Sequence, residues 1–310
     1  MDNTFAEDKP YMKTNYYIRE SILSKGQGKG ATIIEVYNGK MHFTVTPDNC
    51  GDITNLDFCG ENFSYISSNG YVSNDKKTSF SKSFCGGFLY TCGLDNVCNE
   101  FNGIPMHGTI HNTPASNYFY FCENETITIC LEIPSTELFN KKLLLIRKIE
   151  TRLNSGNLII TDTIENQSSH NDNFILLYHF NLGYPFLDEG VEIKADIEHK
   201  IAVSDLAEEK IKNSLVMTDP CEKEEMCYTN SLLKGSNNIL IVNNKIKKSI
   251  LFDYDTEKLP YFNEWKSMTK NEYALGIEPS VTSFQGEKKF VQIEAYEKKE
   301  YKIIINISQI

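Results

Sequence analysis

Apolar and polar residues alternate at every second position along much of the chain, which predicts β-strands joined by tight turns. The clearest case is the stretch from Thr32 to Val45, where two alternating runs flank Asn38-Gly39. Because Asn and Gly tolerate positive φ at both central turn positions, this stretch predicts a tight hairpin. Runs of this kind, broken by turn signals at short intervals, indicate an antiparallel sandwich or barrel and not βαβ units.

Three further pairs of apolar runs predict hairpins by the same reasoning. They are 142–153 with 158–166, 238–242 with 248–254, and 289–296 with 300–307. Helix is expected only from Asp205 to Leu215, which has a capping acid and apolar residues at helical spacing. No internal repeat or linker divides the chain, so we expect one domain over 1–310. Residues 1–30 would form an N-terminal extension or edge strands, and the polar stretch 208–235 would leave the sheets.

Charge and composition narrow the classes of function. The net charge is −11 and the lysines are scattered among acids, so no continuous basic face is available for nucleic acid. The chain lacks the pattern of a signal peptide and has no apolar run long enough to cross a bilayer. Nine cysteines without a CxxC pair are typical of reduced thiols. We therefore expect a soluble, cytoplasmic protein without membrane or nucleic-acid partners, present as a monomer or homodimer.

The first segment with chemical potential is 84–115, where glycines and prolines surround His107 and His111. Glycine permits close backbone approach to a ligand, and such a loop can fix a side chain above it. The spacing of four suits a metal pair only on a helix, and Gly108 and Pro114 oppose a helix. Metal binding is therefore disfavoured, while hydrogen-bonded structural histidines remain the alternative.

The second segment, 175–190, reads as a buried strand that carries His179 and Asn181. Residues two apart in a strand project from the same face, so both side chains can reach one cavity. Neighbouring aromatic residues would form a wall against which a sugar ring can pack. The alternative is that the two residues face solvent at the end of a strand.

The third segment, 261–280, contains the only tryptophan of the chain, Trp265, between Glu264 and Lys266. Residues 273–277 read as a strand that ends near Glu278. A carboxyl group beside apolar residues has a raised pKa, which suits a general base. A tryptophan with polar neighbours suits sugar binding, although a purely structural tryptophan is equally consistent with the sequence.

Four motifs of this chain resemble those of the aldose 1-epimerase (galactose mutarotase-like) superfamily, and specifically an uncharacterised bacterial branch of it. They are GGFLYTCGLDN at 86–96, MHGTIHNTPA at 106–115, LLYHFNLGYP at 176–185 and LGIEPS at 275–280. Their order and wide separation make coincidence improbable. The resemblance extends from about Gly39 nearly to the end of the chain and leaves out the first thirty residues.

The resemblance implies an all-β fold, a galactose mutarotase-like β-supersandwich with few short helices. It also implies that His179 protonates the ring oxygen, that Glu278 removes the proton of the anomeric hydroxyl, and that His107 hydrogen-bonds the sugar. The expected product is the other anomer, with no cofactor and no metal. We further expect contacts with the sugar from Asp95, Asn112, Asn181, Glu264, Trp265, Lys266 and His111.

The chain departs from the pattern of this branch at two arginine positions, which are occupied by Asn49 and Thr109. Arginine is the side chain best suited to clamp phosphate or carboxylate, so its loss favours a neutral aldose as substrate. His111 stands where the branch has a small residue. Lys266 remains available as a point charge for an anion.

Two other classes of function remain open. A non-catalytic carbohydrate-binding or sensing protein would keep the pocket without turnover. A lyase or glycoside hydrolase is the second alternative, and hydrolysis would need a second carboxylate opposite Glu278, for which Asp95 and Glu264 are the candidates.

Overall fold

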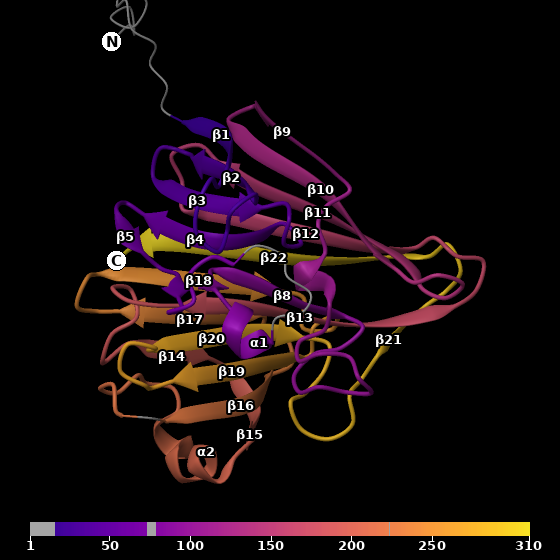
Figure 1. Ribbon diagram of the computed structural model, residues 1–310. Helices are drawn as coiled ribbons and strands as arrows, with labels where there is room; N and C mark the ends of the chain where they lie inside the picture. Colours follow the sequence, from indigo (N-terminus) through magenta and orange to yellow (C-terminus); the bar gives the residue numbers. More distant parts are fainter. Residues whose placement is uncertain (1–15, 73–78, 223) are drawn as a thin grey trace, which may run out of the picture.

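Two antiparallel β-sheets stack face to face and carry most of the regular structure, as the computed structural model shows for residues 16–72, 79–222 and 224–310 (Figure 1). One cluster of buried apolar side chains includes residues of both sheets, so the core lies between them. Burial alternates strictly along strands such as Lys142–Arg152 and Asn157–Asn166, as expected for strands with one face on a core. The predicted all-β sandwich is confirmed.

The larger sheet contains the strands that carry the site. Its order is β1 (Tyr17–Ile22), β2 (Thr32–Tyr37), β3 (Met41–Thr46), β4 (Asp52–Phe58), β8 (Leu89–Leu94), β13 (Asp172–Leu182), β20 (Ala274–Ser280), β19 (Tyr261–Ser267), β16 (Glu225–Leu232) and β15 (Ile197–Ala202). Two short strands join it at the side, β5 (Glu61–Asn62) on β4 and β21 (Val291–Ile293) on β13.

The smaller sheet covers one face of the larger one. Its order is β14 (Glu192–Ala195), β17 (Asn238–Asn243), β18 (Lys248–Tyr254), β22 (Lys298–Gln309), β12 (Asn157–Asn166), β11 (Lys142–Arg152), β10 (Thr126–Thr136) and β9 (Asn117–Glu123). A separate pair, β6 (Tyr65–Ile66) with β7 (Gly86–Gly87), lies beside the larger sheet.

A buried charged cluster joins the two sheets across the core. Arg147 of β11 makes a two-pronged contact with Asp162 of β12, at 2.9 and 2.7 Å, and a third contact of 2.9 Å with Asp52 of β4. Tyr178 of β13 donates to Asp162 at 2.9 Å. All four side chains are almost fully buried. A buried guanidinium is tolerated because two carboxylates share its donors.

The hairpins predicted from local sequence are present, with one exception. β2 pairs with β3, β11 with β12, and β17 with β18. The hairpin predicted between 289–296 and 300–307 is wrong, because β21 pairs with β13 and β22 lies between β12 and β18. Strand β22 is therefore drawn into the middle of the smaller sheet instead of folding back on its sequence neighbour.

In the described part of the chain, helix is confined to short pieces. The predicted helix appears as α2 (Asp205–Lys210), continued by a 3-10 turn, η3 (Ile211–Asn213), and its N-cap is Ser204 and not the acid. Two other pieces, α1 (Phe80–Ser83) and the 3-10 turn η2 (Ile110–Asn112), were not predicted. The expected polar excursion 208–235 is shorter than predicted, because β16 within it belongs to the larger sheet.

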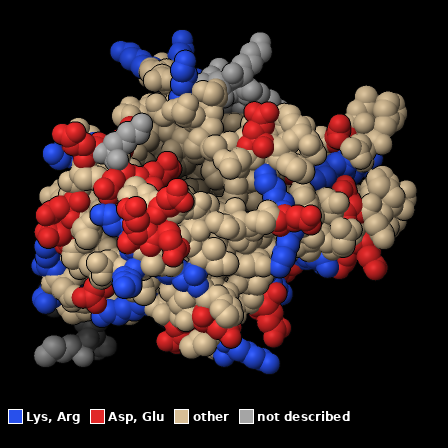
Figure 2. All heavy atoms as spheres, turned by 90° about the horizontal axis from the view of Figure 1, so that it is seen from below, with Lys and Arg blue, Asp and Glu red and all other residues tan. Residues whose placement is uncertain are grey.

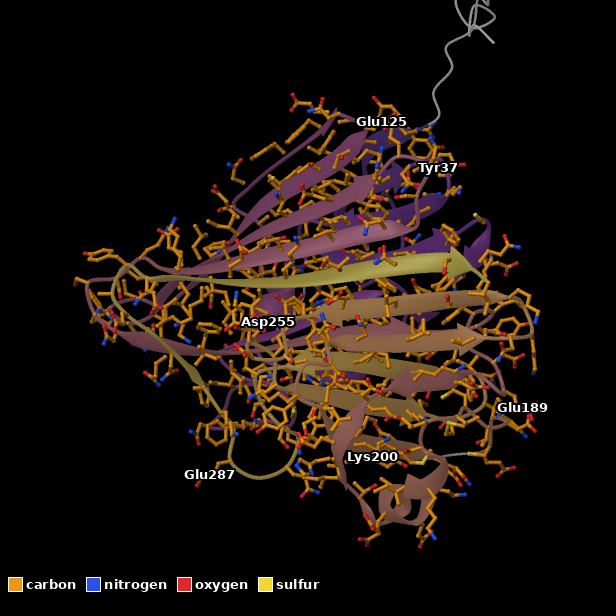
Figure 3. The ribbon with its side chains drawn as sticks, turned by 180° about the vertical axis from the view of Figure 1, so that it is seen from behind. Tyr37, Glu125, Glu189, Lys200, Asp255 and Glu287 are labelled. Carbon is orange, nitrogen blue, oxygen red and sulfur yellow. The ribbon has the colours of Figure 1, made fainter. Side chains whose placement is uncertain are left out.

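Charged side chains lie mainly on the outside, as Glu125, Glu189 and Glu287 illustrate (Figure 3). On the face shown in Figure 2, acidic side chains form a group and basic ones are scattered. In the described part of the chain, no helix is both long enough and apolar enough to span a membrane.

Candidate active site

His179 and Glu278 come from β13 and β20, two neighbouring strands in the interior of the larger sheet. β13 and β20 are hydrogen-bonded neighbours, with Phe180 opposite Ile277. Phe180 packs against Phe252 of the smaller sheet, with ring centroids 5.0 Å apart, so it faces the core. Because side chains alternate between the faces of a strand, His179 and Glu278 project from the other face, away from the smaller sheet.

His179 Nε2 lies 3.2 Å from Glu278 Oε1, and the two side chains are 6% and 0% exposed. The contact does not have the geometry of a hydrogen bond. Among the described residues, neither carboxyl oxygen of Glu278 nor Nδ1 of His179 has a hydrogen-bond partner. Buried polar atoms without partners are rare in folded proteins. Their convergence at one point indicates a place where a polar ligand binds.

Burial controls the protonation of this pair. Removal from water disfavours the charged form of each group, so it raises the pKa of Glu278 and lowers the pKa of His179, both strongly. His107 also lowers the pKa of His179, while Asn181 opposes the shift. Because the two groups interact, their protons belong to the pair. The pair therefore holds one proton between the lowered pKa of the imidazole and the raised pKa of the carboxyl.

His107 reaches the same point from a loop. Its backbone has a φ of 64°, in the left-handed region, and its N–H donates to the carbonyl of Cys98 at 2.9 Å. The imidazole ring lies 5.7 Å from that of His179, and its Nδ1 has no partner among the described residues. Burial, with a smaller effect of Lys288, lowers the pKa of His107 to about 4. His107 is therefore a neutral hydrogen-bonding group at neutral pH.

These three side chains line one cavity of about 430 Å³, a size within the range of small-molecule sites. Its wall is rich in aromatic side chains, namely Tyr65, Phe80, Phe84, Trp265 and Phe284. The Trp265 ring lies 5.5 Å from that of His179. An apolar wall around a few convergent polar groups is typical of a site for a small polar molecule with apolar faces, such as a sugar.

Gly276 keeps the floor of this cavity open. A Cβ at this position would lie 2.6 Å from Glu278 Oε1 and 3.1 Å from both His179 Cε1 and Trp265 Cβ. Its φ lies outside the left-handed region, so the glycine is needed for space and not for backbone conformation. The absence of a side chain here allows the imidazole, the carboxyl and the indole to meet.

Glu264 and Lys266 were expected to contact the sugar, and the structure corrects this. Neighbouring residues of a strand face opposite sides, so Trp265 faces the cavity while the residues on either side of it face the interior. Glu264 contacts Lys200 at 3.0 Å and Lys266 at 3.3 Å. Lys266 also donates to the carbonyl of Ser214. These contacts hold the segment that follows α2. Lys200 lies close to α2 (Figure 3).

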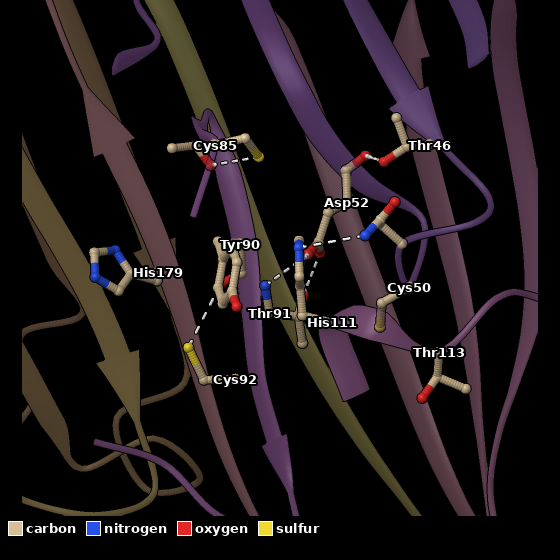
Figure 4. Close-up of polar contacts among 12 residues, drawn as sticks. Thr46, Cys50, Asp52, Cys85, Tyr90, Thr91, Cys92, His111, Thr113 and His179 are labelled. Carbon is tan, nitrogen blue, oxygen red and sulfur yellow. Dashed lines mark hydrogen bonds and ion pairs between the residues drawn. The ribbon is translucent and has the colours of Figure 1, made fainter. Parts of the chain in front are cut away.

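His111 is the second correction, because it does not line the cavity. Its Nδ1 lies 2.7 Å from Asp52 Oδ2, and its ring stacks on Tyr90 with centroids 3.7 Å apart. Tyr90 is the strand partner of His179 and lies between the two histidines (Figure 4). His111 therefore belongs to the buried polar cluster behind the site.

Asn49 lies beside His111 and contacts its second ring nitrogen. Asn49 Nδ2 lies 3.4 Å from His111 Nε2, and Asn49 Oδ1 accepts from Tyr71 at 2.6 Å. Asp52 contacts one ring nitrogen of His111 and Asn49 contacts the other, so both ring nitrogens have a polar partner. Two positions at which this sequence departs from the related branch thus contact each other.

The remaining candidates lie near the cavity without lining it. Asp95 accepts from the backbone N–H and the hydroxyl of Thr109, at 3.0 and 2.5 Å, and so holds the turn that follows His107. Asn112 ends η2 and is not among the lining residues. Asn181 is fully buried beside His179, donates to its carbonyl at 3.0 Å, and has no partner for Oδ1 among the described residues. The expected direct sugar contacts of these residues are not supported by this geometry.

Several lining residues were not predicted, although local signals for them exist. Phe80 and Phe84 lie four apart in and just after α1, which brings both rings to the cavity. Cys227 is opposite Trp265 in the strand register, so Cys227 and Glu225, two residues apart, face the same side as the indole. Glu225 Oε1 accepts from Trp265 Nε1 at 2.7 Å. Among the described residues, no group of three or more His, Cys, Asp or Glu is arranged to hold a metal ion.

Solved structures with the same fold are numerous. A candidate aldose 1-epimerase from Klebsiella pneumoniae subsp. pneumoniae superposes with a TM-score of 0.87 at 19% identity, over 94% of this chain and 83% of the other. A galactose mutarotase-like protein from Clostridium acetobutylicum gives 0.69 at 14% identity, over 95% and 99%. Galactose 1-epimerase from Lactobacillus acidophilus gives 0.64 at 12% identity, over 94% and 99%. The galactose mutarotase-like fold predicted from the four motifs is confirmed.

At the level of sequence, no curated protein matches this chain. A family model described as "Domain of unknown function (DUF4432)" matches residues 28–307. This span begins close to the point where the resemblance of the motifs begins and includes every residue that lines the cavity. The chain belongs to the DUF4432 family, and its fold is that of the galactose mutarotases.

Proposed function

We propose that this protein is an aldose 1-epimerase, which interconverts the anomers of a sugar by opening and closing its ring. The observation that carries the proposal is the meeting of a buried imidazole and a buried carboxyl, 3.2 Å apart, in a cavity with an aromatic wall. Their ring nitrogen and carboxyl oxygens have no hydrogen-bond partner among the described residues, so they are available to a substrate. The likeness of the fold to galactose 1-epimerase adds support.

In the proposed reaction, Glu278 takes the proton of the O1 hydroxyl while His179 gives a proton to O5. The C1–O5 bond breaks and the sugar becomes an open-chain aldehyde. Rotation about C1–C2 presents the other face of the carbonyl, and the reverse transfers close the ring as the other anomer. Burial favours the neutral form of both groups, so in the free protein the single proton of the pair resides on Glu278 and has to pass to His179 when the sugar binds. Ring opening then takes one proton from His179 and gives one to Glu278, and ring closure reverses both transfers. The protein therefore ends each cycle in its starting protonation state.

His107 supports this transfer as a neutral hydrogen-bonding group. Because burial holds its pKa at about 4, it does not compete for the proton near neutral pH. Each positioned proton transfer contributes about 10² to 10⁴-fold. Two transfers are sufficient for a reaction that already occurs in water.

A neutral aldose is the proposed substrate. No lysine or arginine occurs among the described residues that line the cavity, whereas Glu225, Glu272 and Glu278 do. Phosphate and carboxylate groups on a substrate would therefore meet no cation there. Asp95 and Glu264, the expected candidates for the second acid of a glycoside hydrolase, are engaged outside the cavity, so among the described lining residues only Glu225 and Glu272 could take that role.

The test is anomer exchange measured by NMR over a panel of neutral and phosphorylated aldoses. We expect wild type to accelerate exchange of at least one neutral aldose, and Glu278→Gln and His179→Ala to lower kcat by about 10²-fold or more. His170→Ala removes an exposed histidine outside the cavity and serves as the matched control. No acceleration of any aldose would refute the proposal. Saturable sugar binding that is indifferent to Glu278→Gln, without turnover, would identify a binding or sensing protein instead.

A further inference from the structure

Two carboxylates lie at the mouth of the cavity, in addition to the buried Glu278. Glu225 is on β16 and Glu272 is in the turn between β19 and β20, and both are exposed. Glu225 accepts from the Trp265 indole N–H, and Glu272 accepts from the Ser68 hydroxyl at 3.4 Å. Neither carboxylate forms an ion pair with a described residue. Among residues 16–72, 79–222 and 224–310, no cation compensates these two negative charges.

Lys288 is the described cation that acts on the polar groups of the cavity, and its ammonium is directed elsewhere. Lys288 acts on His107 electrostatically, but its ammonium donates to Asn96 and to the carbonyl of Asn99 and lies over the ring of Phe101. Lys288 does not line the cavity. The described lining thus carries charge of one sign only.

A cleft with charge of one sign and apolar walls concentrates ligands of the opposite sign and repels ligands of the same sign. Metal ions are poor candidates for the attracted species, because the described residues offer no group of three ligands that could hold one. The remaining cation that fits a sugar cavity is a protonated amine on the sugar itself. Its natural place is a carbon remote from C1, because C1 and O5 meet His179 and Glu278 at the buried end.

We infer that the affinity of this cavity depends on the charge of the sugar, and that it binds amino sugars more tightly than their neutral and acidic counterparts. This inference rests on the proposed function. Glu225 and Glu272 are the groups that distinguish these charges. Neutral aldoses remain substrates, because ring opening needs only the buried pair. The preference is expressed in affinity, and salt weakens it because both carboxylates are exposed.

The only tryptophan provides the readout, since Trp265 lines the cavity. Its fluorescence is titrated with four ligands: the neutral aldose that binds best, its 3-amino-3-deoxy derivative, the N-acetylated form of that derivative, and the uronic acid. At low salt and neutral pH we expect the amine to bind about fivefold more tightly than the neutral parent. The uronic acid is expected to bind more weakly, and the ratios to approach one at high salt.

The double variant Glu225→Gln/Glu272→Gln tests the assignment of these groups. Glutamine keeps an acceptor for the indole N–H and removes both charges, so the preference for the amine is expected to vanish. The control Glu123→Gln/Glu257→Gln removes two exposed charges outside the cavity and is expected to keep it.

Equal affinity for the amine and its N-acetylated form, or a preference that survives in the cavity double variant, would overturn the inference. Turnover of neutral aldoses is measured in the same samples and separates the two proposals. If the protein turns over neutral aldoses and its affinity does not depend on charge, the proposed function stands and this inference fails. If the protein prefers the amine and turns over no aldose, the inferred selectivity stands and the proposed epimerase activity fails.

Discussion

His179 and Glu278 face each other at 3.2 Å across two neighbouring strands, and neither forms a hydrogen bond to the other. In a structural ion pair the remaining acceptors and donors are satisfied by neighbours, as they are for Arg147 with Asp162. Here they have no partner among the described residues, although both side chains line a cavity. This contrast between the two buried pairs is the reason why we assign Arg147 and Asp162 to the fold and propose a catalytic role for His179 and Glu278.

The pH dependence of turnover is the first prediction. The reaction needs one proton on the pair, so kcat is lost when a second proton binds at low pH and when the last one leaves at high pH. Burial lowers the pKa of His179, so we expect the acid limb below the ordinary histidine value of about 6.5. Rates of anomer exchange across a pH series check this. An acid limb above 6.5 would contradict it.

Glu278→Gln is expected to stabilise the protein while it removes activity. Burial raises the pKa of Glu278, so the folded state holds a proton that the unfolded state releases above about pH 4.5. Folding stability contributed by this group therefore falls as pH rises above that value. Glutamine does not ionise, so the gain in Tm over wild type should grow with pH. The measurement is thermal unfolding of both proteins from pH 5 to 9, and a Tm difference independent of pH would contradict the assignment.

Gly276→Ala is expected to impair turnover without unfolding the protein. The new methyl group would lie 2.6 Å from Glu278 Oε1, and the carboxyl side chain must rotate away to relieve the contact. A displacement of about 1 Å at a catalytic group costs about 10²-fold in rate. Anomer exchange measures the loss, and circular dichroism checks that the sheets persist. Wild-type rates in Gly276→Ala would show that the carboxyl geometry is not critical.

Arg147→Met is expected to lower the free energy of unfolding by about 3–5 kcal/mol, because Asp52 and Asp162 then lose their shared cation in the core. Arg152→Met is the matched control. Arg152 pairs with Glu125 at the surface, where the two side chains are 70% and 68% exposed, so the expected loss is about 1 kcal/mol or less. Urea unfolding measures both changes. Equal losses in the two variants would show that the cluster between the sheets contributes no more to the free energy of unfolding than a surface ion pair.

Local sequence was sufficient where the structure depends on local chemistry. The hairpin signalled by Asn38-Gly39 forms, but its turn is centred on Gly39 and Lys40. Gly39 has a φ of 104°, and Asn38 stabilises the turn because its Oδ1 accepts from the backbone N–H groups of Lys40 and Met41. The residues 289–307 carry equally clear strand patterns, yet their pairing partners lie far away in the chain, on β12, β13 and β18. A periodic pattern specifies that a strand forms and which face is buried. It does not specify which strand lies beside it.

In the candidate site, too, features that depend on local sequence were predicted and features that depend on the pairing of distant strands were not. His179 and Glu278 were identified by their motifs, and the structure brings them together. Glu264 and Lys266 were misassigned because proximity in sequence to Trp265 was given more weight than the alternation of a strand. Glu225 was missed because it reaches the indole only through the pairing of β16 with β19, which no local pattern predicts.

The pairing of β13 with β20 also has a consequence for biosynthesis. His179 on β13 leaves the ribosome about a hundred residues before Glu278 on β20. β13 can therefore pair with β20 only late in translation. Contacts between such distant segments form slowly, since a long loop has to close first. Nascent or truncated chains that end before β20 lack Glu278, so they are expected to lack the proposed activity.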